Sequence, residues 1–189
     1  MEKKRNENLN EKVSMKPGQD IVMAGYIALQ GTIEAVEKEE ELLRRTLPQD
    51  LLDTARGFTE YLELEKELSR YAGTIAMQEV KTGGIFAALW EMAKQYKVGL
   101  TVYLKKIPVR QETIEICEVL DLNPYELLSG GCILLTADNG NDLICELESK
   151  GIPAAFIGKI TDSNDRIILN GENCRYLNRP EPDEITKLL

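Results

Sequence analysis

Short apolar runs recur along the chain, and longer stretches between them carry apolar residues every three or four positions. The short runs predict β-strands, and the longer stretches predict amphipathic α-helices with one buried face. The clearest helical spacing follows a Gly-Gly pair and is carried by Ile85, Ala88, Leu89, Met92 and Tyr96. This pattern predicts a helix that starts at Gly84 and ends at Gly99, a residue typical of helix C-caps.

The same reading extends over the remaining chain. Strands are expected at 20–25, 74–80, 100–104, 132–137, 153–160, 166–170 and 174–177. Helices are expected from Gly31 onward, over 48–72, within 107–120 with Ile114, Cys117 and Leu120 facing inward, over 141–151 with Asn141 as N-cap, and at 183–189. Asn170-Gly171 is typical of a hairpin turn.

The alternation of these elements predicts an α/β (α+β) fold, as a single domain with a mixed sheet and flanking helices. Residues 1–16 are polar and charged without periodicity, and they are expected to form a disordered tail or linker. Pro17-Gly18 then marks the start of one domain, 17–189.

The charge balance argues against a general nucleic-acid binder. The chain has 23 basic and 32 acidic side chains and a net charge of −9, whereas phosphate contacts need clustered Lys and Arg. No apolar run approaches the roughly 18 residues of a membrane span, and the start of the chain lacks the apolar core of a secretory signal. The sequence therefore predicts a cytoplasmic protein without membrane contact.

Catalytic chemistry based on histidine is excluded, because the chain contains none. Ser-His-Asp and Cys-His nucleophiles are therefore impossible. The four cysteines are widely spaced, which favours reduced structural thiols over a zinc or disulfide framework. The acidic run 39–41 is interpreted as a solvated helix face, because adjacent helical residues point in different directions. No metal site is predicted from the residues themselves.

Two glycine pairs are the candidate anion sites. Thr82-Gly83-Gly84 joins a predicted strand to a helix, where free N–H groups and the helix dipole favour an anion, and Lys81 adds positive charge. The alternative is an ordinary helix start. The second pair, in Ser129-Gly130-Gly131, precedes an apolar strand and could be a simple turn. If both loops met at one sheet edge they could share an anion, which sequence spacing alone does not show.

Several segments in the same order resemble one protein family. They are "PGQDIVMAGYIALQGT", "KTGGIFAALWEMAKQYKVG", "IPVRQET", "LNPYELLSGG" and "IPAAFIGKIT". Together they resemble the C-terminal half of the aminoimidazole ribonucleotide (AIR) synthetase superfamily, and within it the AIR-synthase-related and hydrogenase-maturation-factor-like proteins. The superfamily also includes selenophosphate synthetase and thiamine monophosphate kinase.

The resemblance implies the C-terminal half of an ATP-dependent enzyme that uses ATP and Mg²⁺. The partner would be an N-terminal ATP-binding half, on the same or a separate chain. Such proteins usually dimerise through their N-terminal halves, and a surface left exposed where that half would dock could allow this chain to form a homo-oligomer. Gly83 and Gly84 would donate to phosphate, Lys81 and Thr82 would lie beside it, and Glu79 would help to hold magnesium or orient substrate. The segment Ser129, Gly130 and Gly131 would form the facing loop. Alone, this half is expected to be inactive.

Two departures from the family pattern support a second hypothesis. Related proteins often have a His-Asp or Asp-Pro pair before the first glycine loop, where this chain has Gln78 and Glu79. The C-terminal cysteine of hydrogenase maturation factors is also missing, so nitrile synthesis is not predicted. The chain could thus be a non-catalytic binding or regulatory module with the same fold, or its glycine loops could be purely structural.

Overall fold

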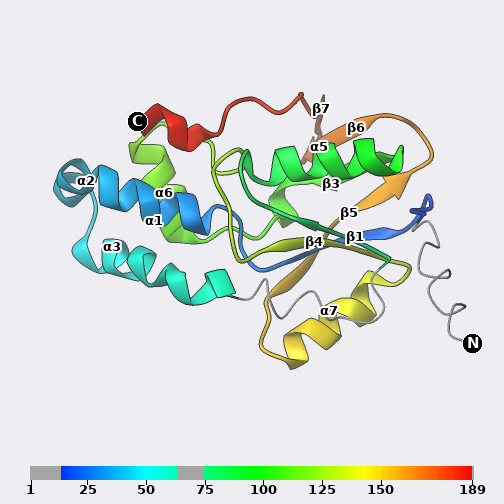
Figure 1. Cartoon of the computed structure of the whole chain (residues 1–189), viewed down its shortest axis with the longest axis horizontal. Coiled ribbons are helices and arrows are strands. Elements are labelled where there is room, and N and C mark those ends of the chain that lie inside the picture. The colour runs from blue at the N-terminus through cyan, green and yellow to red at the C-terminus, as the bar shows by residue number, and fades with distance from the viewer. Residues whose placement is uncertain (1–13, 64–74, 189) are drawn as a thin grey trace, which may run out of the picture.

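The computed structural model describes residues 14–63 and 75–188 of the 189-residue chain. Within them, one mixed sheet has the strand order β2-β4-β1-β5-β3-β6-β7 (Figure 1). The strands are β1 (Asp20–Ala24), β2 (Ala76–Glu79), β3 (Gly99–Tyr103), β4 (Ile133–Ala137), β5 (Ala154–Thr161), β6 (Arg166–Asn170) and β7 (Asn173–Tyr176). The helices are α1 (Leu29–Lys38), α2 (Glu40–Thr46), α3 (Gln49–Arg56), α5 (Gly84–Tyr96), α6 (Gln111–Val119) and α7 (Gly140–Ser149). Short 3₁₀ helices are η1 (Gly57–Glu63), η2 (Leu104–Lys106) and η3 (Glu184–Leu188).

Antiparallel pairing dominates the sheet. Strand β3 pairs in parallel with β6, and every other neighbouring pair is antiparallel. The hairpin β6–β7 turns at Gly171 with Asn170 opposite Asn173, as the sequence predicted. The expectation of a mixed sheet with flanking helices is confirmed.

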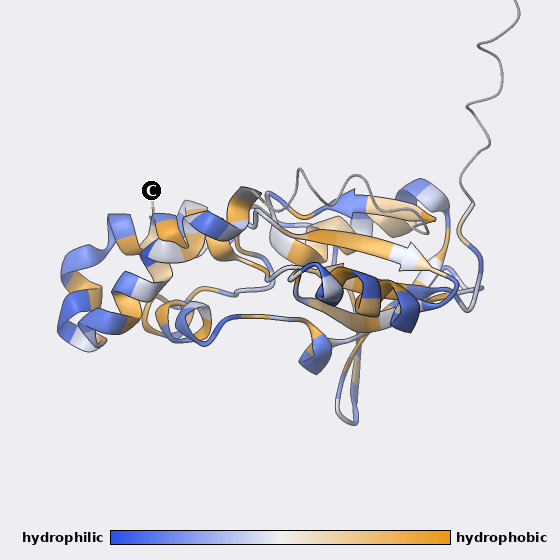
Figure 2. Cartoon of the chain, turned by 90° about the horizontal axis from the view of Figure 1, so that it is seen from below, coloured by the Kyte–Doolittle hydropathy of each residue, from blue (hydrophilic) through white to orange (hydrophobic). Residues whose placement is uncertain are grey.

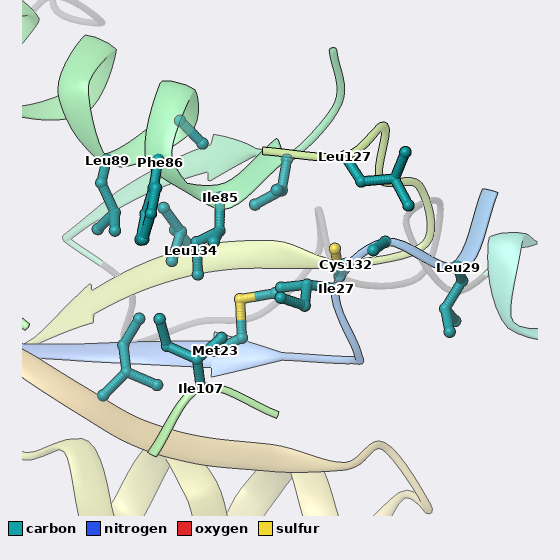
Figure 3. Close-up of a cluster of buried hydrophobic side chains, with 14 of the residues drawn as sticks. Met23, Ile27, Leu29, Ile85, Phe86, Leu89, Ile107, Leu127, Cys132 and Leu134 are labelled. Atoms are coloured by element: carbon teal, nitrogen blue, oxygen red, sulfur yellow. The ribbon is translucent and has the colours of Figure 1, made fainter. Parts of the chain in front are cut away.

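Helices cover both faces of the sheet, with α5 above it and α7 below it in Figure 1. On β1, Met23 belongs to the large core under α5, while Val22 belongs to a smaller core with Leu143 and Leu147 of α7. Figure 3 shows Ile85, Phe86 and Leu89 in the large cluster with Met23 and Leu134. Two covered faces explain why strand β4 is apolar at nearly every position. Figure 2 shows the hydrophobic residues gathered along the strands.

The helical part of the chain gathers at one end of the sheet, where α1, α2, α3 and α6 lie together (Figure 1). The predicted helical region 48–72, with Gly57 as a possible point of division, is divided there, because α3 ends at Arg56 and the chain continues as the 3₁₀ helix η1. Residues 64–72 of that prediction lie outside the described residues. No helix in residues 14–63 or 75–188 is long and apolar enough to cross a membrane.

Three local predictions are corrected by the structure. Helix α5 is closed by Lys97 in the left-handed region, while Gly99 starts β3, where a Cβ would meet Thr161 Oγ1 at 2.4 Å. The cap of α7 is Asn139, whose side chain accepts the N–H groups of residues 141 and 142. Ile114 is 39 % exposed, because α6 turns Thr113 inward to bond the Thr32 hydroxyl at 2.9 Å.

Near the start of the described chain, Met15 is 5 % exposed and belongs to the large core. Residues 1–13 of the predicted tail lie outside the described residues. None of the four cysteines, all of which lie in the described residues, forms a disulfide; Cys117 and Cys132 are buried and Cys145 and Cys174 are exposed.

Removing a buried side chain from the sheet should destabilise the fold strongly. Leu134 is fully buried on β4, so Leu134→Ala should lower the free energy of unfolding by roughly 2–5 kcal/mol through lost burial and a residual cavity. Leu42→Ala is the control, because Leu42 is 46 % exposed and should change stability by about 0.5 kcal/mol or less. Urea unfolding of both variants measures the difference, and equal effects would contradict the assigned burial.

Asp20 connects three elements and should make stability depend on acid pH. Its carboxylate accepts Gly140 N at 2.9 Å and Lys159 Nζ at 2.5 Å. Burial alone would raise the pKa of Asp20, but the bonds from Lys159 and Gly140 and the Lys159 charge together lower it below the ordinary value of 3.8. The stabilisation is therefore complete above pH 3.8 and is lost as pH falls through the lower folded-state pKa.

The measurement compares the wild type with Asp20→Asn in chemical unfolding across acid pH. The wild type should be more stable above pH 3.8, and the difference should shrink below it. A difference that does not change with pH would show that this carboxylate contributes nothing through its charge.

Candidate functional site

The first glycine loop joins β2 to α5, and its two central amides are already bonded within the chain. Gly84 N donates to the carbonyl oxygen of Lys81 at 3.0 Å. Gly83 N donates to Oδ2 of Asp183 at 2.6 Å. Gly83 and Gly84 have φ of 77° and 63°, a left-handed conformation that glycine adopts at little cost. The loop therefore starts α5 with the N–H groups of Gly83 and Gly84 satisfied by groups of the chain itself.

Asp183 is the residue of this region that the sequence reading did not single out. It is 5 % exposed, and its second oxygen, Oδ1, accepts Leu128 N at 3.0 Å and Ile185 N at 2.9 Å. An Asp ahead of a terminal helical segment is a recognisable N-cap signal, which explains the bond to Ile185. Nothing in the local sequence signals the bonds to Gly83 and Leu128.

The second glycine loop lies directly against the first. Ser129 N donates to the Lys81 carbonyl oxygen at 3.2 Å, so one acceptor serves both loops. The Ser129 hydroxyl is fully buried, accepts Ala28 N at 2.7 Å and donates to Leu127 O at 3.2 Å. These contacts bring the two loops together at one edge of the sheet.

Neighbouring residues of α1 and η1 cover the glycines of the second loop. A Cβ at Gly131 would lie 2.2 Å from Tyr61 O, and one at Gly130 would lie 3.0 Å from Gln30 Oε1. Both residues therefore contact helical segments α1 and η1 rather than open solvent.

A surface hollow of about 250 Å³ opens beside the first loop. It is lined by Gln78, Glu79, Lys81, Thr82, Ala87, Ala88 and Glu91. Lys81 and Glu79 form a 2.6 Å ion pair in which both side chains are about half exposed, so the pair contributes little to stability. Three residues predicted for the site, Glu79, Lys81 and Thr82, thus line one accessible hollow.

Cation-binding and nucleophilic groups are sparse around these loops. Across residues 14–63 and 75–188, no group of three or more His, Cys, Asp or Glu side chains is placed to hold a metal. Burial, and then the charge of Glu184, raises the pKa of Cys117 to about 12, so this thiol stays protonated at neutral pH. A larger hollow of about 440 Å³ lies away from the loops among Lys38, Glu40, Glu41, Arg44 and Arg45, where Arg44 and Arg45 already pair with the two acids.

The mixed sheet, with glycine loops meeting at its edge, defines an α/β domain of the kind that the resemblance implied. A family model described as AIR synthase related protein, C-terminal domain, matches residues 16–170. The chain belongs to this family.

Relatives of known name are longer than this chain. It is 25 % identical over 160 residues to a putative hydrogenase expression/formation protein of Methanocaldococcus jannaschii, covering 82 % of this chain and 46 % of the relative. It is 32 % identical over 146 residues to phosphoribosylformylglycinamidine synthase subunit PurL of Campylobacter lari, covering 74 % of this chain and 19 % of the relative. The chain therefore spans about half or less of the length of these relatives.

Solved structures show the same fold. Escherichia coli HypE, a hydrogenase maturation protein, superimposes with a TM-score of 0.73 at 19 % identity, covering 93 % of this chain and 54 % of HypE. A HypE structure in complex with ATP has a TM-score of 0.65 at 17 % identity, covering 90 % of this chain and 53 % of that one.

Gly84 should tolerate no side chain. A Cβ there would lie 2.5 Å from Tyr125 O, and the left-handed φ adds strain, so Gly84→Ala should cost roughly 2–4 kcal/mol of stability. Gly57→Ala is the matched control, because nothing lies within 4 Å of its Cβ position and its φ is −68°. Thermal unfolding of the two variants compares them, and a Gly84→Ala protein as stable as the Gly57→Ala protein would contradict the packing of this loop.

Proposed function

We propose that this chain is the C-terminal half of an ATP-dependent protein of the AIR synthetase superfamily and acts with an N-terminal ATP-binding half. Support comes from the family match over residues 16–170 and from relatives about twice as long. The HypE neighbour in complex with ATP supports a nucleotide as the ligand. Mg²⁺ would accompany the nucleotide, as in phosphoryl transfer generally.

The hollow beside the first glycine loop is the observation that carries the proposal. Lys81 can supply positive charge, and the Thr82 hydroxyl a hydrogen bond, to phosphate oxygens that enter there. Glu79 could bind a cation that accompanies the nucleotide. A single acidic residue of this kind is a weak cation ligand alone, so most ligands for Mg²⁺ would come from the N-terminal half and the phosphates.

The side chains available in this chain explain why it would depend on an N-terminal half. The chain has no histidine, and Cys117 is held protonated by burial. Phosphoryl transfer relies mainly on positioning and charge stabilisation, which a complete cleft between two halves would provide. This chain alone is therefore expected to turn over little or no ATP.

A second function, a non-catalytic binding or regulatory module, is favoured by the bonding of the loops. The amides of Gly83 and Gly84 are both satisfied within the chain, and Gly131 is covered by Tyr61. Glycines in such positions serve the fold whether or not phosphate ever binds. The replacement of the family's His-Asp pair by Gln78 and Glu79 agrees with this alternative.

Calorimetric titration with ATP and Mg²⁺ separates the two functions. The chain mixed with a matching N-terminal half should bind ATP, and Lys81→Ala should weaken binding by about tenfold, or about 1.4 kcal/mol, through the loss of a charged contact. Lys150→Ala is the control, because Lys150 lies at the C-terminal end of α7 and pairs with Glu146 at 3.0 Å.

Two results would decide against the ATP-dependent function. The first is that ATP and Mg²⁺ give no heat of binding with the mixture of this chain and the N-terminal half. The non-catalytic binding module would then be the remaining function. The other is equal ATP affinity of the Lys81→Ala and Lys150→Ala mixtures, which would place the nucleotide away from the hollow.

A further inference from the structure

The buried carboxylate of Asp183 accepts the N–H of Gly83, one of the amides that the family resemblance assigns to a phosphate. Its two oxygens receive N–H groups from two different loops, Gly83 at 2.6 Å and Leu128 at 3.0 Å, besides Ile185 of its own segment. A phosphate presents pairs of oxygens of similar spacing and the same charge sign. The amides of Gly83 and Leu128 are thus placed to bind an oxyanion, and in this structure they bind the carboxylate of Asp183.

In the described part of the chain, backbone N–H groups are the hydrogen-bond donors to this carboxylate. Asp183 is 5 % exposed, and no Lys or Arg of the described residues forms an ion pair with it. The positive end of the α5 dipole and the three N–H donors hold it in place. A buried, unpaired carboxylate is costly to maintain, so an incoming anion with additional contacts can compete with it.

The segment that carries Asp183 is attached in a way that permits release. Residues 178–182 are all exposed and include Pro180 and Pro182, while Leu177 before them is anchored by its N–H to Arg166 O at 2.7 Å. We call residues 178–188 the C-terminal strap.

Beyond Asp183, the strap makes polar contacts with loop 121–128, and η3 also contacts α1. Asn123 N donates to Glu184 Oε2 at 2.8 Å, and Lys187 Nζ donates to Asp121 O at 3.4 Å. Ile185 and Leu188 are only partly buried against the core. The strap can therefore leave without dismantling the sheet or the buried core.

We propose that Asp183 is an internal competitor for oxyanions, and that the C-terminal strap must release it before Gly83 and Leu128 can bind a phosphate. The inference rests on the proposed function, because it concerns the same loop. It adds a closed state, in which the chain blocks its own site, and an open state, in which a polyphosphate replaces Asp183.

The test measures binding of inorganic tripolyphosphate to the full 189-residue chain. Asp183→Asn keeps the size of the side chain but removes its charge, and it brings an NH₂ group that cannot accept the loop amides. This variant should bind tripolyphosphate at least tenfold more tightly than the wild type. Glu181→Gln is the matched control, since Glu181 is an exposed acid of the same strap, and it should bind like the wild type.

A second measurement uses the wild type and does not depend on folding of the variant. Saturating tripolyphosphate should speed hydrogen exchange at the amide of Ile185, which loses Asp183 as its acceptor. Unchanged exchange at Ile185 would overturn the proposal, as would a folded Asp183→Asn chain that binds tripolyphosphate no better than the wild type.

The results also separate this inference from the proposed function. If Lys81→Ala weakens ATP binding in the assembled protein while Asp183→Asn changes nothing, the strap is only structural. If Asp183→Asn tightens tripolyphosphate binding while Lys81→Ala leaves ATP binding unchanged, Asp183 does compete with oxyanions and the proposed ATP-dependent function is wrong.

Discussion

The carbonyl oxygen of Lys81 holds the two glycine loops together, because it accepts N–H groups from both Gly84 and Ser129. Buried backbone donors must find acceptors. At this edge of the sheet, the first loop supplies the carbonyl oxygen that the N–H of Ser129 in the second loop needs. Ser129 adds to the junction through its buried hydroxyl, which binds Ala28 at the start of α1. The start of α5, the entry to β4 and the start of α1 therefore form one connected unit.

This arrangement gives the glycines a structural purpose that exists before any ligand. Gly84 lies under Tyr125 O and Gly131 lies under Tyr61 O, both at distances that leave no room for a Cβ. A phosphate-binding loop usually leaves amides free to face its ligand. Here only one central donor of the first loop, Gly83 N, is bonded to a side chain, and that side chain belongs to a peripheral segment. The N–H of Gly84 is thus bonded to the backbone of its own loop, whereas the N–H of Gly83 depends on the segment that carries Asp183.

Much of the fold could be predicted from the sequence, since the large elements follow from hydrophobic spacing. The stripe from Ile85 to Met92 predicted α5, and alternating or fully apolar runs predicted the strands. The errors occur where tertiary contacts override local preference. Gly99 is required by the close approach of β3 to β5, and Thr113 takes the inward position expected of Ile114 because it bonds Thr32.

The candidate site was predictable only in part. Local sequence pointed to Lys81 and Thr82 because glycine pairs at strand-to-helix junctions have a recognisable pattern. Asp183 could not be found in this way, since its partner Gly83 lies 100 residues away in the sequence. Hydrogen bonds of that separation depend on the topology of the whole domain, which a local pattern does not contain.

The place of β1 in the sheet has a consequence for synthesis on the ribosome. The strand Asp20–Ala24 is synthesised long before its two neighbours in the sheet, β4 and β5, whose residues start at Ile133 and Ala154. More than a hundred further residues must therefore be translated before either neighbouring strand can pair with β1 and cover its apolar side chains. Such long-range pairing slows folding and exposes strand edges meanwhile, so the nascent chain is a natural client for chaperones that shield apolar segments.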